Sequence, residues 1–378
     1  MSLLRILLLS CSIGEGHDSA AKAVMEALEC HGVTAELHDA LALLSPKLAK
    51  FIGNWHVRRY RYAPKLFDAG YKMAEYITDE PDDPDFLYEA LALGSEKLQR
   101  FLADGNYDAV ICTHVFGGML MTEVRKKFKL KVPCFLIATD YSCVPYTEQC
   151  EMNCYFIPSP DLAAEYAGSG LPKERFIPAG IPIRQAFYYK EDRSSARAAL
   201  GLNPEGVVVL LMGGSMGCGP MRKIAKKIRE RIPEGGTVVT FCGRNERLYE
   251  SLEDLADDHF HVLGFTQAVS RYMDAADMII TKPGGLSSTE AANKHLPMVF
   301  IHTVGGCETY NFDFFLQKGC AVGSKNADEV LDLVSGLMRS PERLERMKRQ
   351  LEADFTCNGA DLIARHVIAA AEEYLGTN

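Results

Sequence analysis

The stretch TKPGGLSSTE, residues 281–290, holds residue types suited to binding an anion that is attached to a sugar. The apolar residues before it predict a strand, and a helical pattern begins near Ser287. Gly284 and Gly285 leave backbone N–H groups free near the start of this helix, where the helix dipole attracts negative charge. Glu290, one turn into the helix, can accept hydrogen bonds from two adjacent hydroxyls, as a ribose presents. We therefore expect a phosphate and a sugar to bind at this turn.

Two other turns of the second half offer similar groups. In LLMGGSMGCG, Gly214 and Ser215 belong to a glycine-rich turn that can wrap a phosphate with backbone N–H groups. The lysine of a P-loop is missing from this turn, which argues against nucleoside triphosphate hydrolysis of that type. In TVGGCETYN, Glu308 and Asn311 follow a predicted strand, where they can hydrogen-bond to the hydroxyls of a sugar.

The first half begins with an apolar strand that runs into CSIGEGHDSAA. Gly14 and Gly16 permit a tight turn, in a weak match to a dinucleotide-binding fingerprint that places Asp39 near the position of the ribose-binding acid. His17 follows these glycines, and its imidazole can take a proton from an attacking hydroxyl near neutral pH. The alternative is that His17 caps the helix or bonds to a backbone carbonyl.

A second candidate for chemistry in the first half is Asp140, in ATDYSCVPY. It ends a buried apolar strand and should therefore lie at the carboxyl edge of a parallel sheet, where α/β proteins bind their ligands. There its carboxylate can orient His17 or bind the hydroxyl of an acceptor. The alternative is that Asp140 caps the next turn.

Strands that alternate with helices must position these residues, and the sequence shows this alternation in both halves. The first half predicts strands at 5–12, 33–40, 107–114 and 132–140 and helices at 18–32, with Asp18 or Ser19 as its N-cap, and at 117–129. The second half predicts a strand that runs into the glycine turn within 206–217, a helix at 220–232, and strands at 236–243, 277–285 and 296–301. The alternation predicts an α/β protein whose halves are separate doubly wound domains with parallel sheets.

The domain boundaries follow from the same pattern. We place the linker at 175–187, in a stretch that contains prolines. The expected domains are 1–178 and 179–360, and an amphipathic helix at 361–378 is expected to pack back on the first domain.

Composition excludes several classes of protein. The chain has 378 residues and a formal net charge of −9, which argues against a bulk electrostatic grip on nucleic acid. It contains no apolar run of about 18 residues, so no span of a membrane is expected. Its 12 cysteines are scattered and form no CxxC pair, which predicts reduced thiols in a cytosolic protein and no metal site.

Residues 45–90 depart from the alternation of strands and helices and mix aromatic with basic residues. Trp55, Arg58, Arg59 and Arg61 lie in this segment. One interpretation is an amphipathic helical insertion that packs on its own domain. The other is a surface that docks to a membrane or a lipid acceptor, with basic groups toward anionic headgroups and aromatic rings at the interface.

Two longer stretches resemble a known family. GFTQAVSRYMDAADMIITKPGGLSSTEAANKHLPMVFIHTVGGCETYN, residues 264–311, resembles the donor-binding half of the family 28 glycosyltransferases. SCSIGEGHDSAAKAV looks like the amino-terminal signature of the branch that contains the monogalactosyldiacylglycerol synthases and the processive diacylglycerol glucosyltransferases. The resemblance implies a GT-B fold, in which two Rossmann-like domains face one another across a cleft.

The resemblance also implies roles for residues by motif position. Phe265 would lie beside the uracil of a UDP-sugar and Glu290 would hold its ribose, while His17 would be the base with Asp140 as its companion near the acceptor. The implied donor site comprises Gly214, Ser215, Gly243, Phe265, Lys282, Gly284, Gly285, Ser287, Ser288, Glu290, Gly306, Cys307, Glu308 and Asn311. Gly14 and Gly16 would form the loop near the acceptor and phosphates.

The implied activity is inverting transfer of a hexose from a UDP-sugar to a diacylglycerol-like lipid, by an enzyme bound peripherally at the cytoplasmic face of the membrane. Enzymes of this type generally need no bound metal, and no cofactor is expected beside the donor substrate. Two alternatives share the fold, namely a UDP-sugar 2-epimerase-like enzyme and a non-catalytic UDP-sugar-binding regulator. An NAD-dependent dehydrogenase is a further alternative, less favoured than these.

The chain departs from the family pattern at three positions. The branch often carries a histidine and a tryptophan shortly after the aspartate, where this chain has Val144 and Thr147. Cys307 stands where the family usually has a glutamine, which is suited to binding a sugar hydroxyl. The motifs therefore leave the sugar and the acceptor lipid undefined.

Overall fold

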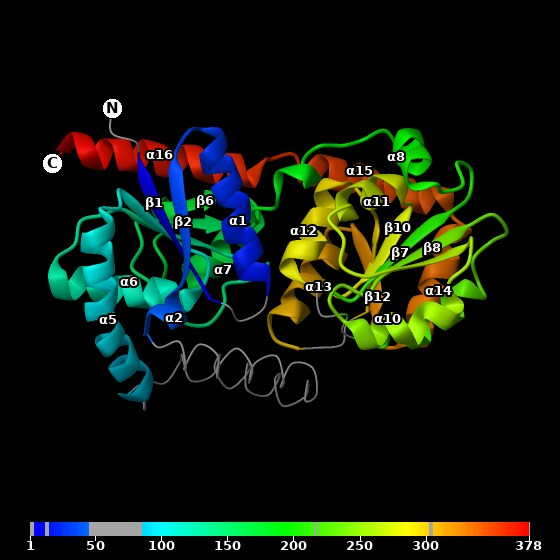
Figure 1. The fold of residues 1–378 in the computed structure, drawn as a ribbon, viewed down its shortest axis with the longest axis horizontal. Helices are drawn as coiled ribbons and strands as arrows, with labels where there is room; N and C mark the ends of the chain where they lie inside the picture. Colours follow the sequence, from blue (N-terminus) through cyan, green and yellow to red (C-terminus); the bar gives the residue numbers. More distant parts are fainter. Residues whose placement is uncertain are drawn as a thin grey trace. The chain divides into compact units, whose positions relative to one another are not determined.

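The computed structural model describes residues 4–11, 15–44, 85–214, 217, 219–301 and 305–377. The chain divides into two compact units, which are Met1–Gln185 with Cys357–Asn378, and Ala186–Thr356 (Figure 1). The sequence analysis placed the boundary at 178/179, whereas the units separate after Gln185. The predicted linker at 175–187 therefore contains β6 (Phe176–Pro178), which is a strand of the first sheet.

The first unit is built on a parallel sheet of six strands in the order β2-β1-β3-β4-β5-β6. Its other strands are β1 (Arg5–Ser10), β2 (Thr34–Asp39), β3 (Ala109–Cys112), β4 (Cys134–Ile137) and β5 (Cys154–Ile157). Its helices are α1 (Glu15–Cys30), α2 (Ala40–Leu44), α5 (Asp85–Gly105), α6 (Val115–Phe128), α7 (Ala163–Gly168) and α16 (Gly359–Thr377). The order of strands reverses between β1 and β3, so the switch point of this sheet lies there.

The second unit contains a parallel sheet of six strands in the order β12-β11-β10-β7-β8-β9. The strands are β7 (Val208–Met212), β8 (Thr237–Phe241), β9 (Phe260–Leu263), β10 (Met278–Thr281), β11 (Met298–Ile301) and β12 (Ala321–Ser324). The helices are α8 (Arg193–Leu200), α9 (Met221–Arg229), α10 (Glu246–Leu252), α11 (Val269–Ala275), α12 (Gly285–Asn293), α13 (Cys307–Gln317), α14 (Ala327–Met338) and α15 (Pro341–Asp354). The switch point of this sheet lies between β7 and β10.

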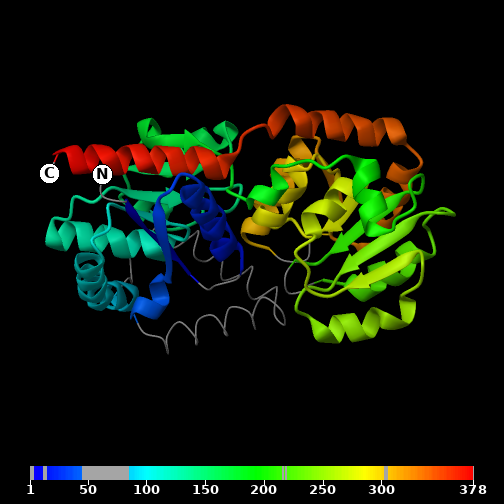
Figure 2. The ribbon, with the colours of Figure 1, turned by 45° about the horizontal axis from the view of Figure 1, so that its top comes forward.

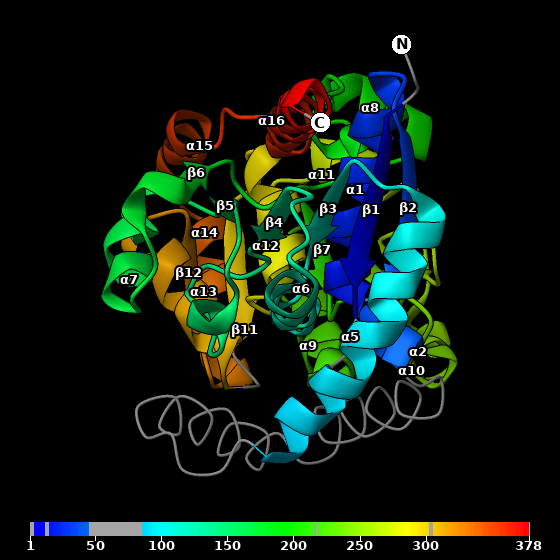
Figure 3. The same cartoon turned by 90° about the vertical axis from the view of Figure 1, so that its left-hand side faces the viewer.

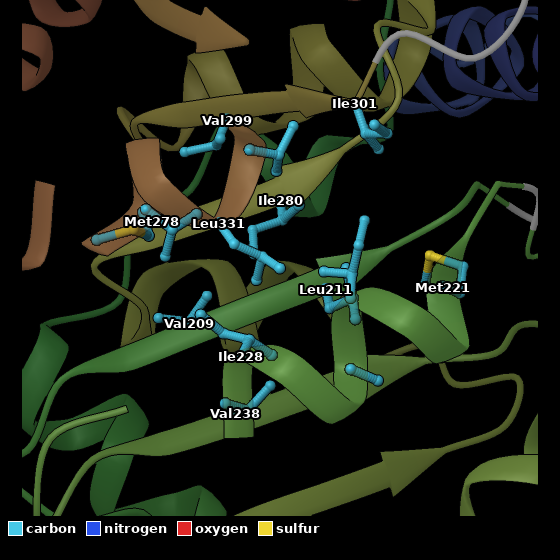
Figure 4. Packing of buried hydrophobic residues seen from close by; sticks show 14 of the residues in the cluster. Val209, Leu211, Met221, Ile228, Val238, Met278, Ile280, Val299, Ile301 and Leu331 are labelled. Carbon is cyan, nitrogen blue, oxygen red and sulfur yellow. The ribbon is translucent and has the colours of Figure 1, made fainter. Parts of the chain in front are cut away.

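The core of the second unit explains why its strands read as continuous apolar runs. Every residue of β7, β8, β10 and β11 is buried, as expected for parallel strands with helices on both faces. Val299 and Ile301 belong to a cluster with residues of α9 and α14 (Figure 4). Phe300, between them, contacts the rings of Phe312 and Phe315 in α13 instead. Successive side chains thus alternate between two apolar layers.

Helix α16 belongs to the first unit although it follows the whole second unit in sequence. It packs against α1 and β3 and can be followed in red in Figures 2 and 3. One face of the helix packs against the rest of the unit, because its buried residues recur at helical spacing, namely Ile363, Ala364, Val367 and Ala371. Among the described residues, no helix is long and apolar enough to cross a membrane.

Three sequence predictions about elements are wrong in detail. Helix α1 begins at Glu15, so Asp18 and Ser19 lie inside it and are not its N-cap. Helix α12 begins at Gly285, ahead of the predicted start near Ser287. The predicted strands of the second half end with 296–301, whereas β12 pairs with β11 beyond them. A segment of four residues such as AVGS in β12, which includes a glycine and a serine, carries too weak a periodic signal to be separated from loop.

Candidate functional site

His17 lies in the first turn of α1, after β1, on one side of the switch point of the first sheet. Its Nδ1 is 2.8 Å from the carbonyl oxygen of Thr113, which follows β3 on the other side. Because a carbonyl oxygen only accepts, Nδ1 carries the proton in this contact, and the lone pair of the neutral ring lies on Nε2. Thr139 Oγ1, after β4, is 3.1 Å from the same Nδ1. The Thr113 carbonyl therefore favours the tautomer with Nε2 as the basic nitrogen, and residues at the ends of β3 and β4 hold the ring.

The charge state of His17 also suits a base. Burial lowers the pKa of His17 from its ordinary value, while the negative charge of Asp140 and the carbonyl of Thr113 act in the opposite direction. A lowered pKa keeps the imidazole neutral near pH 7, which is the state that can accept a proton. Asp140, half-buried at the end of the strand segment that begins with β4, acts on His17 through its charge.

His114 is a site residue that the sequence analysis missed. Its ring centroid is 4.5 Å from that of His17, with the two rings nearly perpendicular. It is the N-cap of α6, where its Nδ1 accepts the N–H of Phe116 at 3.1 Å. The predicted strand 107–114 ended at His114, but its importance depends on the pairing of β3 with β1, which the sequence did not define.

Two other acids of the first unit, Asp18 and Asp39, have structural partners. Asp18 accepts a hydrogen bond from the Ser10 hydroxyl at 2.5 Å. Asp39 Oδ1 accepts the N–H groups of Leu41 and Ala42 at 2.8 and 3.2 Å, so Asp39 caps α2. Asp39 therefore caps a helix, and this contact gives no support to a role in binding the ribose of a dinucleotide.

Helix α12 presents its N-terminus at the switch point of the second sheet, directly after β10. Gly284 is the N-cap residue, with φ −80° and ψ 139°, and Gly285 is the first residue of the helix. Ser287 and Glu290 are half-buried, so both have surface in reach of a ligand. Ser288 is fully buried, and its hydroxyl has no hydrogen-bond partner among the described residues.

Helix α13 contributes two predicted residues to the same turn. Lys282 Nζ forms an ion pair with Oε1 of Glu308, and the side chains are 17% and 6% exposed. Asn311 is fully buried and donates from Nδ2 to the carbonyl oxygen of Pro283 at 3.0 Å. Both residues therefore hold the Lys-Pro-Gly-Gly turn, and their predicted contacts with a hexose stay predictions.

Glycines line the space around this turn. Gly214, after β7, has φ +71°, and a Cβ built on it would lie 2.8 Å from Cε of Lys282. A side chain here would therefore be strained and would collide with the lysine. Gly306 has φ 72° and ψ −143° as the N-cap residue of α13, and Cys307 begins that helix half-buried.

The guanidinium of Arg244, after β8, lies beside the aromatic ring of Phe265, after β9. Phe265 is 62% exposed, and the guanidinium of Arg244 lies 5.1 Å from the centroid of its ring. Gly243, with φ +57°, precedes Arg244. An exposed ring held by a cation offers a stacking surface for a nucleobase. The sequence analysis missed Arg244, because its contact with Phe265 depends on the pairing of β8 with β9.

Several predicted residues lie outside the described part of the chain. These are Gly14, Trp55, Arg58, Arg59, Arg61 and Ser215. Gly16 is described and lies in the first turn of α1. The three departures from the family pattern are also described, and two of them bond to one another, because Thr147 Oγ1 donates to the carbonyl of Val144 at 2.6 Å. In the described ranges, no group of three or more His, Cys, Asp or Glu residues is arranged to hold a metal ion.

Comparisons with known proteins identify the class. MurG of Acinetobacter baumannii has a similar structure, with a TM-score of 0.64 over 97% of this chain and 99% of that chain at 14% identity. A protein described as a putative UDP-N-acetylglucosamine 2-epimerase from Listeria monocytogenes gives a TM-score of 0.63 at 12% identity, over 100% of this chain and 98% of that chain. At these identities the likeness concerns the fold, and the fold is GT-B.

The sequence comparisons define the family. The family model of monogalactosyldiacylglycerol (MGDG) synthase matches residues 17–183, and that of the glycosyltransferase family 28 C-terminal domain matches residues 208–363. Processive diacylglycerol beta-glucosyltransferase of Bacillus licheniformis is 26% identical over 97% of this chain and 95% of that protein. The protein with the same name in Staphylococcus saprophyticus is 25% identical over 92% of this chain and 88% of that protein. The chain belongs to the family 28 glycosyltransferases, in the branch that contains these proteins.

Proposed function

We propose that the protein transfers a hexose from a UDP-sugar to the hydroxyl of a diacylglycerol-like lipid with inversion at the anomeric carbon. The observation that carries this proposal is the bond from His17 Nδ1 to the Thr113 carbonyl, which leaves Nε2 as the basic nitrogen. The relatives named for diacylglycerol glucosyl transfer support the acceptor class.

In the proposed reaction, His17 Nε2 takes the proton of the acceptor hydroxyl as its oxygen bonds to the anomeric carbon. The bond from that carbon to the diphosphate oxygen breaks, and UDP leaves with the electron pair. Attack from the side opposite UDP inverts the configuration. The negative charge of Asp140 stabilises the imidazolium that forms, since it favours the protonated ring.

The groups of the second unit support a UDP-sugar as donor. The N-terminus of α12 and the cation of Lys282 can stabilise the charge on a leaving diphosphate. Phe265 offers a face to the uracil, and Glu290 has surface for the ribose. A similar fold was solved with UDP-GlcNAc in the 2-epimerase of Neisseria meningitidis, at a TM-score of 0.59. We propose that the helix dipole and the lysine replace a metal ion, so that no cofactor is required.

The lipid acceptor implies that the protein works at a membrane surface, and we propose peripheral binding at the cytoplasmic face. Trp55, Arg58, Arg59 and Arg61 remain the candidates for that contact. Vesicles with and without anionic lipid test this part, because a basic and aromatic surface binds the anionic vesicles more tightly.

Transfer assays test the function. Purified protein is incubated with UDP-glucose or UDP-galactose and diacylglycerol vesicles, and glycolipid is measured by mass spectrometry. We expect product with the wild type, a loss of at least roughly a hundredfold in His17→Ala, and normal activity in His259→Asn, which changes an exposed histidine. Absence of product with every sugar and lipid, or an unchanged His17→Ala rate, would overturn the proposal.

The 2-epimerase alternative is favoured by the structural similarity to 2-epimerases. It predicts that UDP-GlcNAc changes to its C2 epimer without any acceptor. NMR of UDP-GlcNAc incubated with the protein alone distinguishes the two activities, since a transferase needs the lipid to consume the donor.

A further inference from the structure

The Lys282–Glu308 ion pair occupies the place where the proposed donor site must bind two different groups. Lys282 follows β10 and is the cation closest in sequence to the N-terminus of α12, which favours a phosphate. Glu308, in the first turn of α13, is an acceptor suited to sugar hydroxyls. In the structure the ammonium group of Lys282 and the carboxylate of Glu308 form an ion pair with one another.

Two glycines border the pair. A Cβ at Gly214 would lie 2.8 Å from Lys282 Cε, and a Cβ at Gly284 would lie 3.5 Å from Lys282 Nζ and 4.0 Å from Glu308 Oε1. Two turns that come from different strands therefore both carry glycine where they meet the pair. Glycine at both positions lets the backbone lie close to the Lys282 side chain.

Charge decides what happens when a diphosphate enters. The Glu308 carboxylate pairs with Lys282 in a part of the protein with little solvent, where an ion pair is weakly screened. A diphosphate brings more negative charge and more acceptor oxygens than a single carboxylate, so it competes for the same ammonium group. Once Lys282 turns to the diphosphate, the lysine no longer neutralises the buried carboxylate of Glu308, and hexose hydroxyls can donate hydrogen bonds to that carboxylate.

We propose that Lys282 exchanges partners during donor binding, from Glu308 to the diphosphate, and that this exchange releases Glu308 to bind the hexose. The inference rests on the proposed UDP-sugar function and deepens it. Recognition of the sugar is then coupled to recognition of the phosphates, because one lysine cannot neutralise both anions equally. UDP alone must displace Glu308 without offering it new donors, whereas a UDP-hexose compensates that carboxylate.

The exchange gives Glu308→Gln opposite effects on two ligands. The variant releases Lys282, so we expect UDP to bind roughly tenfold more tightly than to the wild type. The same variant lacks the carboxylate for the hexose, so the affinity ratio of UDP-hexose to UDP falls. Uridine, which has no phosphate, is expected to bind wild type and variant equally. Isothermal titration calorimetry on the full chain measures all three ligands.

Two controls separate the exchange from simple charge removal. Asp313→Asn removes an exposed charge from the same helix and should leave UDP affinity unchanged. In the Lys282→Met background, Glu308→Gln should give no gain, because there is no lysine to release. The double variant removes both charges together, so it avoids the buried unpaired carboxylate that can unfold Lys282→Met.

The outcomes are distinct. Equal or weaker UDP binding by Glu308→Gln overturns the exchange, and so does a gain that persists in the Lys282→Met background. A folded wild type that binds neither UDP nor any UDP-hexose overturns the proposed function, and the exchange with it. Wild-type binding combined with one of the first two results leaves the proposed function standing and removes the exchange alone.

Discussion

The basic nitrogen of His17 depends on the bond of its ring to the Thr113 carbonyl, and its pKa depends on burial and on the nearby carboxylates of Asp140 and Asp18. Asp140 raises the pKa of His17 against the lowering effect of burial. In Asp140→Asn the charge is lost, so we expect the acidic limb of the kcat/KM profile to move to lower pH, with a lower plateau. Asp104→Asn, an exposed change in the first unit, should leave the profile in place. A limb that stays fixed or moves to higher pH would contradict this role of Asp140.

His114 combines two functions that substitution can separate. Asn is a good N-cap, so His114→Asn keeps the cap of α6 and loses the ring that packs on His17. We expect a thermal midpoint close to wild type and a kcat that falls several-fold. His114→Ala loses both the cap and the ring, and loss of the cap should lower the free energy of unfolding by about 1 kcal/mol. If His114→Asn keeps full kcat at every pH, the ring has no part in positioning His17.

At the scale of single residues, the sequence identified site residues that are close in sequence to a glycine turn or to the end of a predicted strand. His17 and Lys282 could be identified because a turn and a helix start surround them locally. His114 and Arg244 could not, because each gains its meaning from a ring on a neighbouring strand or helix. Strand order is a property of the folded sheet, and the sequence of one strand does not contain it.

Helix α13 stabilises the turn before α12 through the bond from Asn311 to the Pro283 carbonyl. Asn311→Leu keeps the side-chain volume roughly and removes the donor, which leaves a carbonyl without this partner. We expect a loss of about 1–3 kcal/mol in the free energy of unfolding and weaker binding of UDP, since the turn is less well held. Urea unfolding and calorimetry measure the two effects. Normal stability with loss of hexose discrimination alone would instead indicate a direct contact with the sugar.

The elements that position both candidate sites were predicted well where their apolar runs are long. β1, β7 and β10 lie within predicted segments because apolar runs define them, and α1 overlaps its predicted segment except at its N-terminus because its helical period is clear. The start of α12 was misplaced because Gly285 is a poor helix former and its helical conformation is imposed by the sheet and by α13. Helix boundaries set by tertiary contacts are the part that local sequence does not define.

At the scale of the molecule, each unit has its own sheet and its own switch point, and the chain passes between units after Gln185 and after Thr356. The alternation of strands and helices predicted this doubling, since each half carries enough apolar strands for a sheet. The predicted linker at 175–187 contains the crossing after Gln185, but the boundary at 178/179 lies ahead of it because β6, with FIP, is too short and too exposed to be recognised. The return of α16 could be anticipated from its amphipathic period.

This organisation predicts that the units unfold as separate cooperative transitions, which calorimetry of the full chain can resolve. Ala364 is fully buried in α16, and Ala364→Glu places a charge in the layer against α1 and β3. We expect it to lower the midpoint of the first unit only. UDP at about 100 times its Kd should raise the midpoint of the second unit by roughly 5–10 °C in wild type and variant alike.

The matched control is Ala369→Glu, the same substitution at an exposed position of the same helix. It should change the free energy of unfolding of either unit by no more than about 0.5 kcal/mol and so leave both midpoints nearly unchanged. The assignment of transitions comes from the ligand, because only the unit that binds UDP is stabilised by mass action. A single transition that Ala364→Glu and UDP move together would show that the units unfold as one. In that case α16 stabilises the whole chain, and the donor site is thermodynamically coupled to the unit that carries His17.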